Sequence, residues 1–219
     1  MLLIGLAGCS RSSSSSGSSS APETAENVET EPAHYMVRGQ QDTPPVWMRP
    51  EGTRGDESPT TEGVRRRLPD HGLVATREMA NRITFSDIDG AEEARSFVEG
   101  TDFDRETLLL EPDRIGECFK LDLCYITWSA TEYHTYYARL YRDVEVVCEA
   151  DARVWTVNLI QIPDTLDPDE VTSSGSGTAS GTCHPWQQRL ERRRAETNAS
   201  SRNRDDRDAA STDSASGGQ

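Results

Sequence analysis

The sequence predicts a mainly β protein: a small antiparallel sheet or sandwich of about five strands with one short helix, flanked by disordered N- and C-terminal segments. Three observations lead to this prediction. Apolar and polar residues alternate through residues 116–129, as in a strand with one buried face. Residues 152–162 are β-branched and apolar on both faces, which indicates a central strand. Elsewhere the chain is mostly polar, and only 34% of its 219 residues are hydrophobic.

The predicted elements begin near Leu73. Residues 81–85 are typical of a short strand. Asp89, followed three residues later by a glutamate, has the spacing of a capping box. We therefore expect Asp89 to cap a helix over residues 92–98, which Gly100 ends.

Four further strands are expected. Residues 106–111 form a buried strand that Pro112 should end, because proline cannot donate to a sheet ladder. The alternating segment 116–129 and the aromatic segment 135–142 are separated by a short turn, so we expect them to form a hairpin. Residues 152–162 then provide the central strand.

Composition divides the chain into four parts. Residues 1–9 contain the remnant of a lipoprotein signal, and residues 10–72 form a Ser-rich tether and a loop-like acidic segment. Residues 73–186 form the folded β-domain. Residues 187–219 contain hardly any apolar residue and are predicted to be a disordered tail. Asn198 in this tail starts an Asn-Ala-Ser sequon and is a candidate glycosylation site.

The N-terminus carries a candidate lipidation site. Leu6-Ala7-Gly8-Cys9 resembles the lipobox of secreted lipoproteins, in which small residues precede the cysteine that receives the lipid. A basic region before the apolar segment is missing, and we expect the natural start to lie further upstream. A nearly pure Ser run follows Cys9, as expected of a flexible tether next to a membrane anchor.

The charge is strongly acidic. Asp and Glu number 38 against 23 Lys and Arg, a net charge of -15, and Lys120 is the only lysine. Acid excess with almost no lysine is typical of proteins from salt-loving archaea. Such a charge repels itself in dilute buffer, but near molar salt the screening length falls to about 3 Å. This surface is a poor partner for nucleic acid, so we expect none.

Cysteine number favours two disulfides. If Cys9 carries the lipid, an even set remains in a chain that we expect to be exported: Cys118, Cys124, Cys148 and Cys183. In the predicted hairpin, the loop after the second strand returns to the start of the first strand. This would bring Cys148 close to Cys118 and leave Cys124 to pair with Cys183. The other two pairings remain open.

A metal site is the main rival to the disulfides. His134 and His184 could join cysteine thiolates around a metal, but there is no Cys-x-x-Cys and no regular ligand spacing. No methionine follows Met79, which disfavours a blue-copper site. We therefore expect no metal and no cofactor. No Gly-x-Ser-x-Gly, His-Glu-x-x-His or phosphate loop is present, so we also expect no enzyme activity.

Aromatic residues suggest a binding surface. Tyr136 and Tyr137, together with Trp128 and Trp155, could stack on a carbohydrate or contact a protein partner. The alternative is that these rings fill the core of the sheet.

Five short segments carry a family resemblance: residues 101–109 (TDFDRETLL), 141–144 (YRDV), 148–155 (CEADARVW), 162–164 (IPD) and 180–183 (SGTC). Through them the chain, from about Phe97 to Trp186, resembles a group of uncharacterised haloarchaeal lipoproteins. These proteins have no assigned activity, and so the resemblance implies a location and a fold rather than a reaction.

Together these features predict a cell-surface protein. We expect a lipid-anchored binding or structural module on the outer face of the cytoplasmic membrane, held through the lipid on Cys9, in a halophilic archaeon. Its partner would be an envelope protein or a glycan. The alternative is a secreted enzyme or metal-binding protein that uses Cys/His chemistry.

Overall fold

The computed structural model describes residues 27–39, 44–49 and 68–184, and the single residues 188, 192 and 195. This part of the chain folds into ten strands, two α-helices and one 3-10 turn. The strands form two four-stranded sheets, which face each other, and a two-stranded ribbon. The predicted fold class is therefore confirmed, with about twice the expected number of strands. No described helix is long and apolar enough to cross a membrane.

The first sheet has the strand order β1-β7-β8-β10. Its strands are β1 (Asn27–Glu29), β7 (Phe119–Trp128), β8 (Glu132–Tyr141) and β10 (Ser173–Ser180). The predicted hairpin is present, since β7 and β8 pair antiparallel from Phe119 opposite Tyr141 to Trp128 opposite Tyr133. Strand β10 lies parallel to β8 and forms one edge of the sheet.

The second sheet has the strand order β2-β9-β6-β4. Its strands are β2 (His34–Arg38), β9 (Arg153–Ile162), β6 (Thr107–Gly116) and β4 (Leu73–Val74). Strand β9 has a neighbour on both sides, which confirms the interior position that its apolar sequence predicts. Strand β4 covers β6 only at Leu108 and Leu109, so the rest of β6 is an edge.

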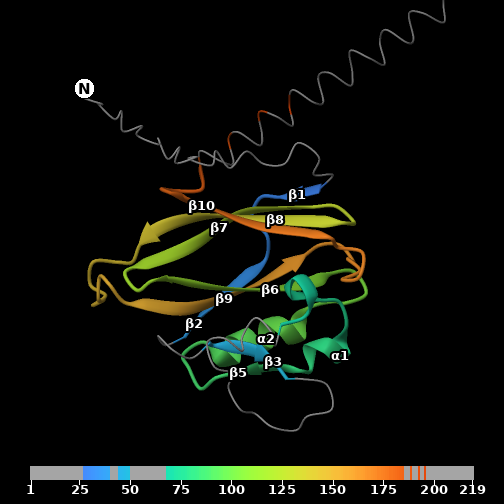
Figure 1. The fold of residues 1–219 in the computed structure, drawn as a ribbon, viewed down its shortest axis with the longest axis horizontal. Coiled ribbons are helices and arrows are strands. Elements are labelled where there is room, and N and C mark those ends of the chain that lie inside the picture. Colours follow the sequence, from blue (N-terminus) through green and yellow to red (C-terminus); the bar gives the residue numbers. More distant parts are fainter. Residues whose placement is uncertain are drawn as a thin grey trace, which may run out of the picture.

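A third layer covers the outer face of the second sheet (Figure 1). It contains α1 (Arg77–Ala80), α2 (Ala91–Gly100) and a ribbon in which β3 (Val46–Met48) pairs with β5 (Ile83–Phe85). Ala94 and Val98 of α2 pack on Leu110 and Leu159 of the sheet. The described residues thus form two large apolar cores, one between the two sheets and one between the second sheet and the helices, and a small third cluster on the outer face of the first sheet.

Two predicted boundaries were wrong. Gly90, at φ 83°, is the N-cap of α2 in place of Asp89, and no side chain caps the helix. A left-handed backbone at this position favours glycine, and a Cβ there would lie 2.8 Å from the Tyr35 hydroxyl. Pro112 does not end β6, because β4 does not extend beside it and a proline is tolerated where the strand is an edge.

Segments predicted to lie outside the domain also contribute strands. Strands β1, β2 and β3 fall within residues 10–72, which we expected to be loop-like, and Trp47 is only 3% exposed. The Ser/Gly-rich segment after β9 lies inside the predicted domain, but no strand was expected there, and it forms β10. The folded part therefore starts well before Leu73, since distant β7 and β9 supply the hydrogen-bond partners of β1 and β2.

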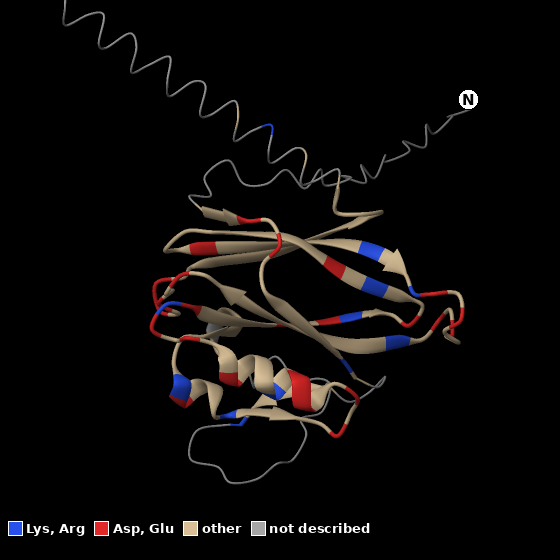
Figure 2. Ribbon diagram, turned by 180° about the vertical axis from the view of Figure 1, so that it is seen from behind, with Lys and Arg blue, Asp and Glu red and all other residues tan. Residues whose placement is uncertain are grey.

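Charged residues are unevenly spread over the fold. Figure 2 marks acidic residues on α2 and in the loops at both ends of the sandwich. Strand β10 carries no charged residue over its eight positions. It forms a neutral strip on a strongly acidic protein.

Candidate functional site

The structure joins the four cysteines in the pairing that the hairpin argument favours. Cys118 is bonded to Cys148, and Cys124 to Cys183. The first bond ties the loop after β8 to the start of β7, and the second ties the segment after β10 to the middle of β7. Because all four sulfurs are in disulfides, they cannot act as the thiolate ligands that a Cys/His metal site requires.

The remaining predicted sites fall into two groups. Cys9 and Asn198 lie outside the described residues. His134 and His184 are described but serve other contacts: His134 lies 4.0 Å from Glu132, and His184 bonds to Gln188. Within the described ranges, no group of three or more His, Cys, Asp or Glu side chains is arranged to hold a metal.

The predicted aromatic surface is not formed. Trp128 and Tyr137 lie in the core between the sheets, whereas Tyr136 lies on the opposite face of the same sheet and stacks on Tyr125 at 4.3 Å. Consecutive residues of a strand point to opposite faces, so Tyr136 and Tyr137 cannot share a surface. Trp155 belongs to the other sheet, where Arg114 lies over its ring. All four predicted rings are at most 7% exposed.

A bulge explains why Tyr125 is not on the face that alternation predicts. Register shifts between Leu123 and Tyr125, so that Cys124 is an extra residue relative to β8. Leu121 and Leu123 face the inter-sheet core, while Tyr125 turns to the outer face with Cys124. Alternation after Leu123 already places Cys124 on the outer face, where it bonds to Cys183, and the bulge adds Tyr125 to that face.

The most distinctive surface is the free edge of β10. On its inner side β10 pairs with β8 along its whole length, but no described strand pairs with its other side. Its sequence, Ser-Ser-Gly-Ser-Gly-Thr-Ala-Ser, contains no charge, proline or bulky side chain. Sheet edges in natural proteins are usually protected by charge, proline, a bulge or a covering segment. This edge has none of the first three.

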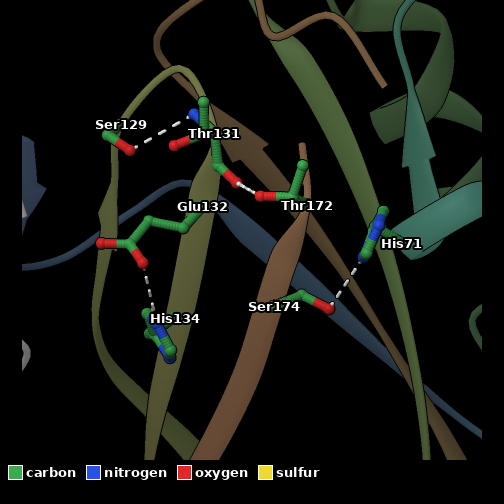
Figure 3. A network of polar contacts seen from close by, with 7 residues as sticks. All are labelled: His71, Ser129, Thr131, Glu132, His134, Thr172 and Ser174. Carbon is green, nitrogen blue, oxygen red and sulfur yellow. Dashed lines mark hydrogen bonds and ion pairs between the residues drawn. The ribbon is translucent and has the colours of Figure 1, made fainter. Parts of the chain in front are cut away.

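Glycine on β10 is required by packing. A Cβ on Gly175 would lie 2.7 Å from Nδ1 of His134, which occupies the outer face of β8. Figure 3 shows His134 next to Glu132 on β8, with β10 running alongside. Gly175 therefore lets β10 pass beside the His134 ring on β8.

Behind the free edge lies a row of polar contacts between the two sheets, which we call the seam. At one end, Nδ1 of His71 lies 3.1 Å from the Ser174 hydroxyl (Figure 3), and the Tyr133 hydroxyl donates to the His71 carbonyl. His71 has φ 54°, a left-handed conformation that is uncommon outside glycine. Gly72 follows at φ 73°, where a Cβ would lie 2.4 Å from the Leu110 carbonyl oxygen.

The middle of the seam holds a partly buried carboxylate, Glu111. Thr135 donates to its Oε1 at 2.8 Å and Tyr137 donates to its Oε2 at 2.5 Å. Burial raises the pKa of Glu111, while hydrogen bonds from Tyr137, Thr135 and Ser176 oppose this rise. The pKa of Tyr137 is held well above its ordinary value, mainly by burial and then by the charge of Glu111. Burial also raises the pKa of Tyr133, to about 12.

The far end of the seam opens into a pocket of about 470 Å³. Arg139 and Arg153 line it together with Asp113 and Thr178 of β10. Arg139 also lies over the Phe119 ring at 5.0 Å. The edge of β10 thus runs from His71 at one end to a pocket lined by three arginines, Arg114, Arg139 and Arg153, at the other.

The His71–Ser174 contact was not predicted, because the two residues are 103 positions apart. A histidine within reach of a hydroxyl can act as a general base, but a nucleophile pair normally has a third group that orients the histidine. Among the described residues, no side chain bonds to the other ring nitrogen of His71.

Comparison with known proteins adds no relative: no family model, no curated protein and no solved structure matches this chain.

Proposed function

We propose that this chain is an exported, lipid-anchored binding module on the surface of a halophilic archaeon. In this proposal the module holds an extended segment of a partner envelope protein against the free edge of β10. The observation that carries the proposal is the unprotected edge itself, eight residues long and without charge.

Export is supported by the cysteines. The two disulfides suit an oxidising compartment, because cytosolic thiols are kept reduced. The Ser-rich run after Cys9 would supply the tether between a membrane anchor and the folded part.

Binding along β10 is supported by its geometry. An extended segment can add to a free sheet edge through main-chain hydrogen bonds, and pockets for alternate side chains then provide specificity. Side chains of a bound segment that point inward would meet the seam, from His71 to the pocket of Arg139 and Arg153. Because β10 carries no charged residue, an acidic partner segment could pair with it without electrostatic repulsion from the strand.

Site-specific crosslinking tests this proposal. A photoreactive residue would replace exposed Ser173 in the native host, with Glu92 on α2 as the control position on the far layer. We expect a discrete crosslinked partner at Ser173 and none at Glu92. The variant Thr178→Lys should abolish the crosslink, because a lysine on an edge strand disfavours pairing with a further strand.

The second step uses the partner peptide that the crosslink identifies. When this peptide binds the purified chain, backbone amides of β10 should exchange more slowly with solvent, and those of α2 should not change. Protection confined to another surface, or equal crosslinking from both positions, would contradict the proposal.

The alternative, a secreted enzyme, is favoured only by the His71–Ser174 contact. If Ser174 were a nucleophile, a fluorophosphonate probe should label the wild-type chain and fail to label both Ser174→Ala and His71→Gln. We expect no labelling of Ser174.

A further inference from the structure

A second pocket, of about 610 Å³, lies on the opposite side of the molecule from the first sheet. The ribbon of β3 and β5 forms one wall, and helices α1 and α2 form the other. Its apolar lining comes from both layers: Trp47, Ala80, Ile83, Phe85 and Val98. The volume is within the usual range for sites that bind small organic molecules.

Three arginines line this pocket, Arg49, Arg77 and Arg95. Arg77 is already engaged, since it donates to the carbonyl oxygens of Val98, Glu99 and Thr101 at the end of α2. Arg95 is different. Its guanidinium lies over the Phe85 ring at 5.3 Å and, among the described residues, makes no hydrogen bond or ion pair.

The wall formed by β3 and β5 also carries hydrogen-bond donors that lack an acceptor. Arg49 donates through Nη2 to the Asn81 carbonyl oxygen at 2.8 Å, but its Nε is buried without an acceptor. The indole nitrogen of Trp47 is likewise buried with no described partner. A buried donor without an acceptor costs about 1–3 kcal/mol, so a shift of these side chains that brought either nitrogen to an acceptor in the pocket would be favoured.

The charge of the pocket limits the ligand. Asp87 and Glu99 line it together with the three arginines, which leaves an excess of one positive charge in a protein of net charge -15. A single negative charge balances this excess. A multiply charged phosphate would instead be repelled by the two carboxylates.

We propose that this pocket binds a small organic monoanion, with a carboxylate at one end and an apolar body. The carboxylate would accept hydrogen bonds from Arg95 and Arg49, because the planar guanidinium matches both carboxylate oxygens. The apolar body would lie on Trp47 and Phe85. This site is separate from the edge of β10 and does not depend on the function proposed for that edge.

Octanoate is a suitable probe, since it combines one carboxylate with a flexible apolar chain. We expect it to bind the full-length chain with a dissociation constant of about 1 mM or below by calorimetry. Octylammonium, of equal length and opposite charge, should bind at least tenfold more weakly. Binding should weaken as salt rises, because Arg95 is exposed.

Substitutions locate the site. Arg95→Gln should weaken octanoate binding about tenfold, the loss expected for one charge-assisted hydrogen bond. Arg105→Gln, on an exposed turn outside the pocket, is the matched control and should leave binding unchanged. Arg95→Lys keeps the positive charge but loses the paired N–H donors of the planar guanidinium. Its affinity for octanoate should therefore lie between those of the wild type and Arg95→Gln.

Three results would overturn the proposal. One is the absence of octanoate binding to the wild-type chain at 1 mM or below. Another is equal binding of octanoate and octylammonium, which would indicate apolar contact without recognition of charge. The third is an equal effect of Arg95→Gln and Arg105→Gln.

Discussion

At the scale of single residues, the fold depends on polar groups that join layers distant in sequence. Glu111 joins the two sheets through Thr135 and Tyr137, and Arg77 joins α1 to the end of α2. Each contact gives a measurable prediction. Hydrogen bonds to a charged group are worth about 1.5–3 kcal/mol when sheltered from water and less when exposed.

Glu111 should make stability depend on pH. Burial raises its pKa in the folded state above the ordinary value of 4.5, so the folded chain holds this proton more tightly than the unfolded chain. Its contribution to the free energy of unfolding is complete below pH 4.5 and is lost as the pH rises through the raised pKa.

The variant Glu111→Gln removes this titration. We therefore expect the free energy of unfolding of the wild type, relative to Glu111→Gln, to fall as the pH rises from 4 towards neutrality. Urea denaturation across this range measures the difference, with Glu93→Gln on α2 as a control for the loss of one carboxylate. A difference that does not change with pH would contradict a raised pKa.

Arg77 should stabilise the packing of α2. Arg77→Gln removes charge-assisted hydrogen bonds to three carbonyl oxygens, and we expect a loss of about 1–2 kcal/mol in the free energy of unfolding. The matched control Arg105→Gln should change it by less than about 0.5 kcal/mol. Equal values for the two variants in urea denaturation would show that the carbonyl contacts contribute nothing measurable.

At the scale of elements, local sequence patterns predict the β7–β8 hairpin. They do not predict strands that form only by pairing with distant segments of the chain. Alternation through β7 and the aromatic run of β8 predict their antiparallel pairing, which also places Cys148 close to Cys118. No strand was predicted at β10, because its Ser and Gly residues give no pattern of alternating apolar residues and Gly has low strand propensity. Its strand conformation depends on β8, whose larger outer side chains require small residues beside them.

The candidate site could be predicted only in part for the same reason. The even number of cysteines and the hairpin lead to the observed disulfides. The bulge at Cys124 leaves no mark in the sequence, and so alternation alone would put Tyr125 on the same face as Leu121 and Leu123, which is wrong. His71 and Ser174 meet only because η2 (Asp70–Gly72) and β10 occupy the same side of the sandwich, a property of the whole topology.

The two disulfides should differ in their effect on stability. Cys124–Cys183 spans 59 residues and Cys118–Cys148 spans 30. Each disulfide should contribute about 2–5 kcal/mol to the free energy of unfolding. Doubling the length of the loop that a disulfide closes adds about 0.6 kcal/mol, because the closed loop lowers the entropy of the unfolded chain. We expect Cys124→Ala with Cys183→Ala to lower the free energy of unfolding more than Cys118→Ala with Cys148→Ala.

Hydrogen exchange separates the local effects of these variants. Loss of Cys124–Cys183 should speed exchange in β10, which follows from its edge position and its few apolar contacts. Loss of Cys118–Cys148 should instead affect the loop after β8. The same exchange pattern in both pairs of variants would contradict this assignment.

At the scale of the whole molecule, net charge dominates. With a net charge of -15, the folded chain repels itself in dilute buffer. We expect the midpoint of thermal unfolding to rise as sodium chloride increases from about 0.1 M to above 1 M, while the screening length falls from about 10 Å to about 3 Å. A midpoint that is constant or falls over this range would argue against adaptation to salt.

The central claim is that this is an anchored surface module held together by two disulfides. The most direct test is the intact mass of the protein purified from native membranes, measured with and without reduction before alkylation. We expect a lipid adduct on Cys9, and alkylation of the other four cysteines only after reduction. A bare Cys9, together with thiols that react without reduction, would contradict both the anchor and the export of the chain.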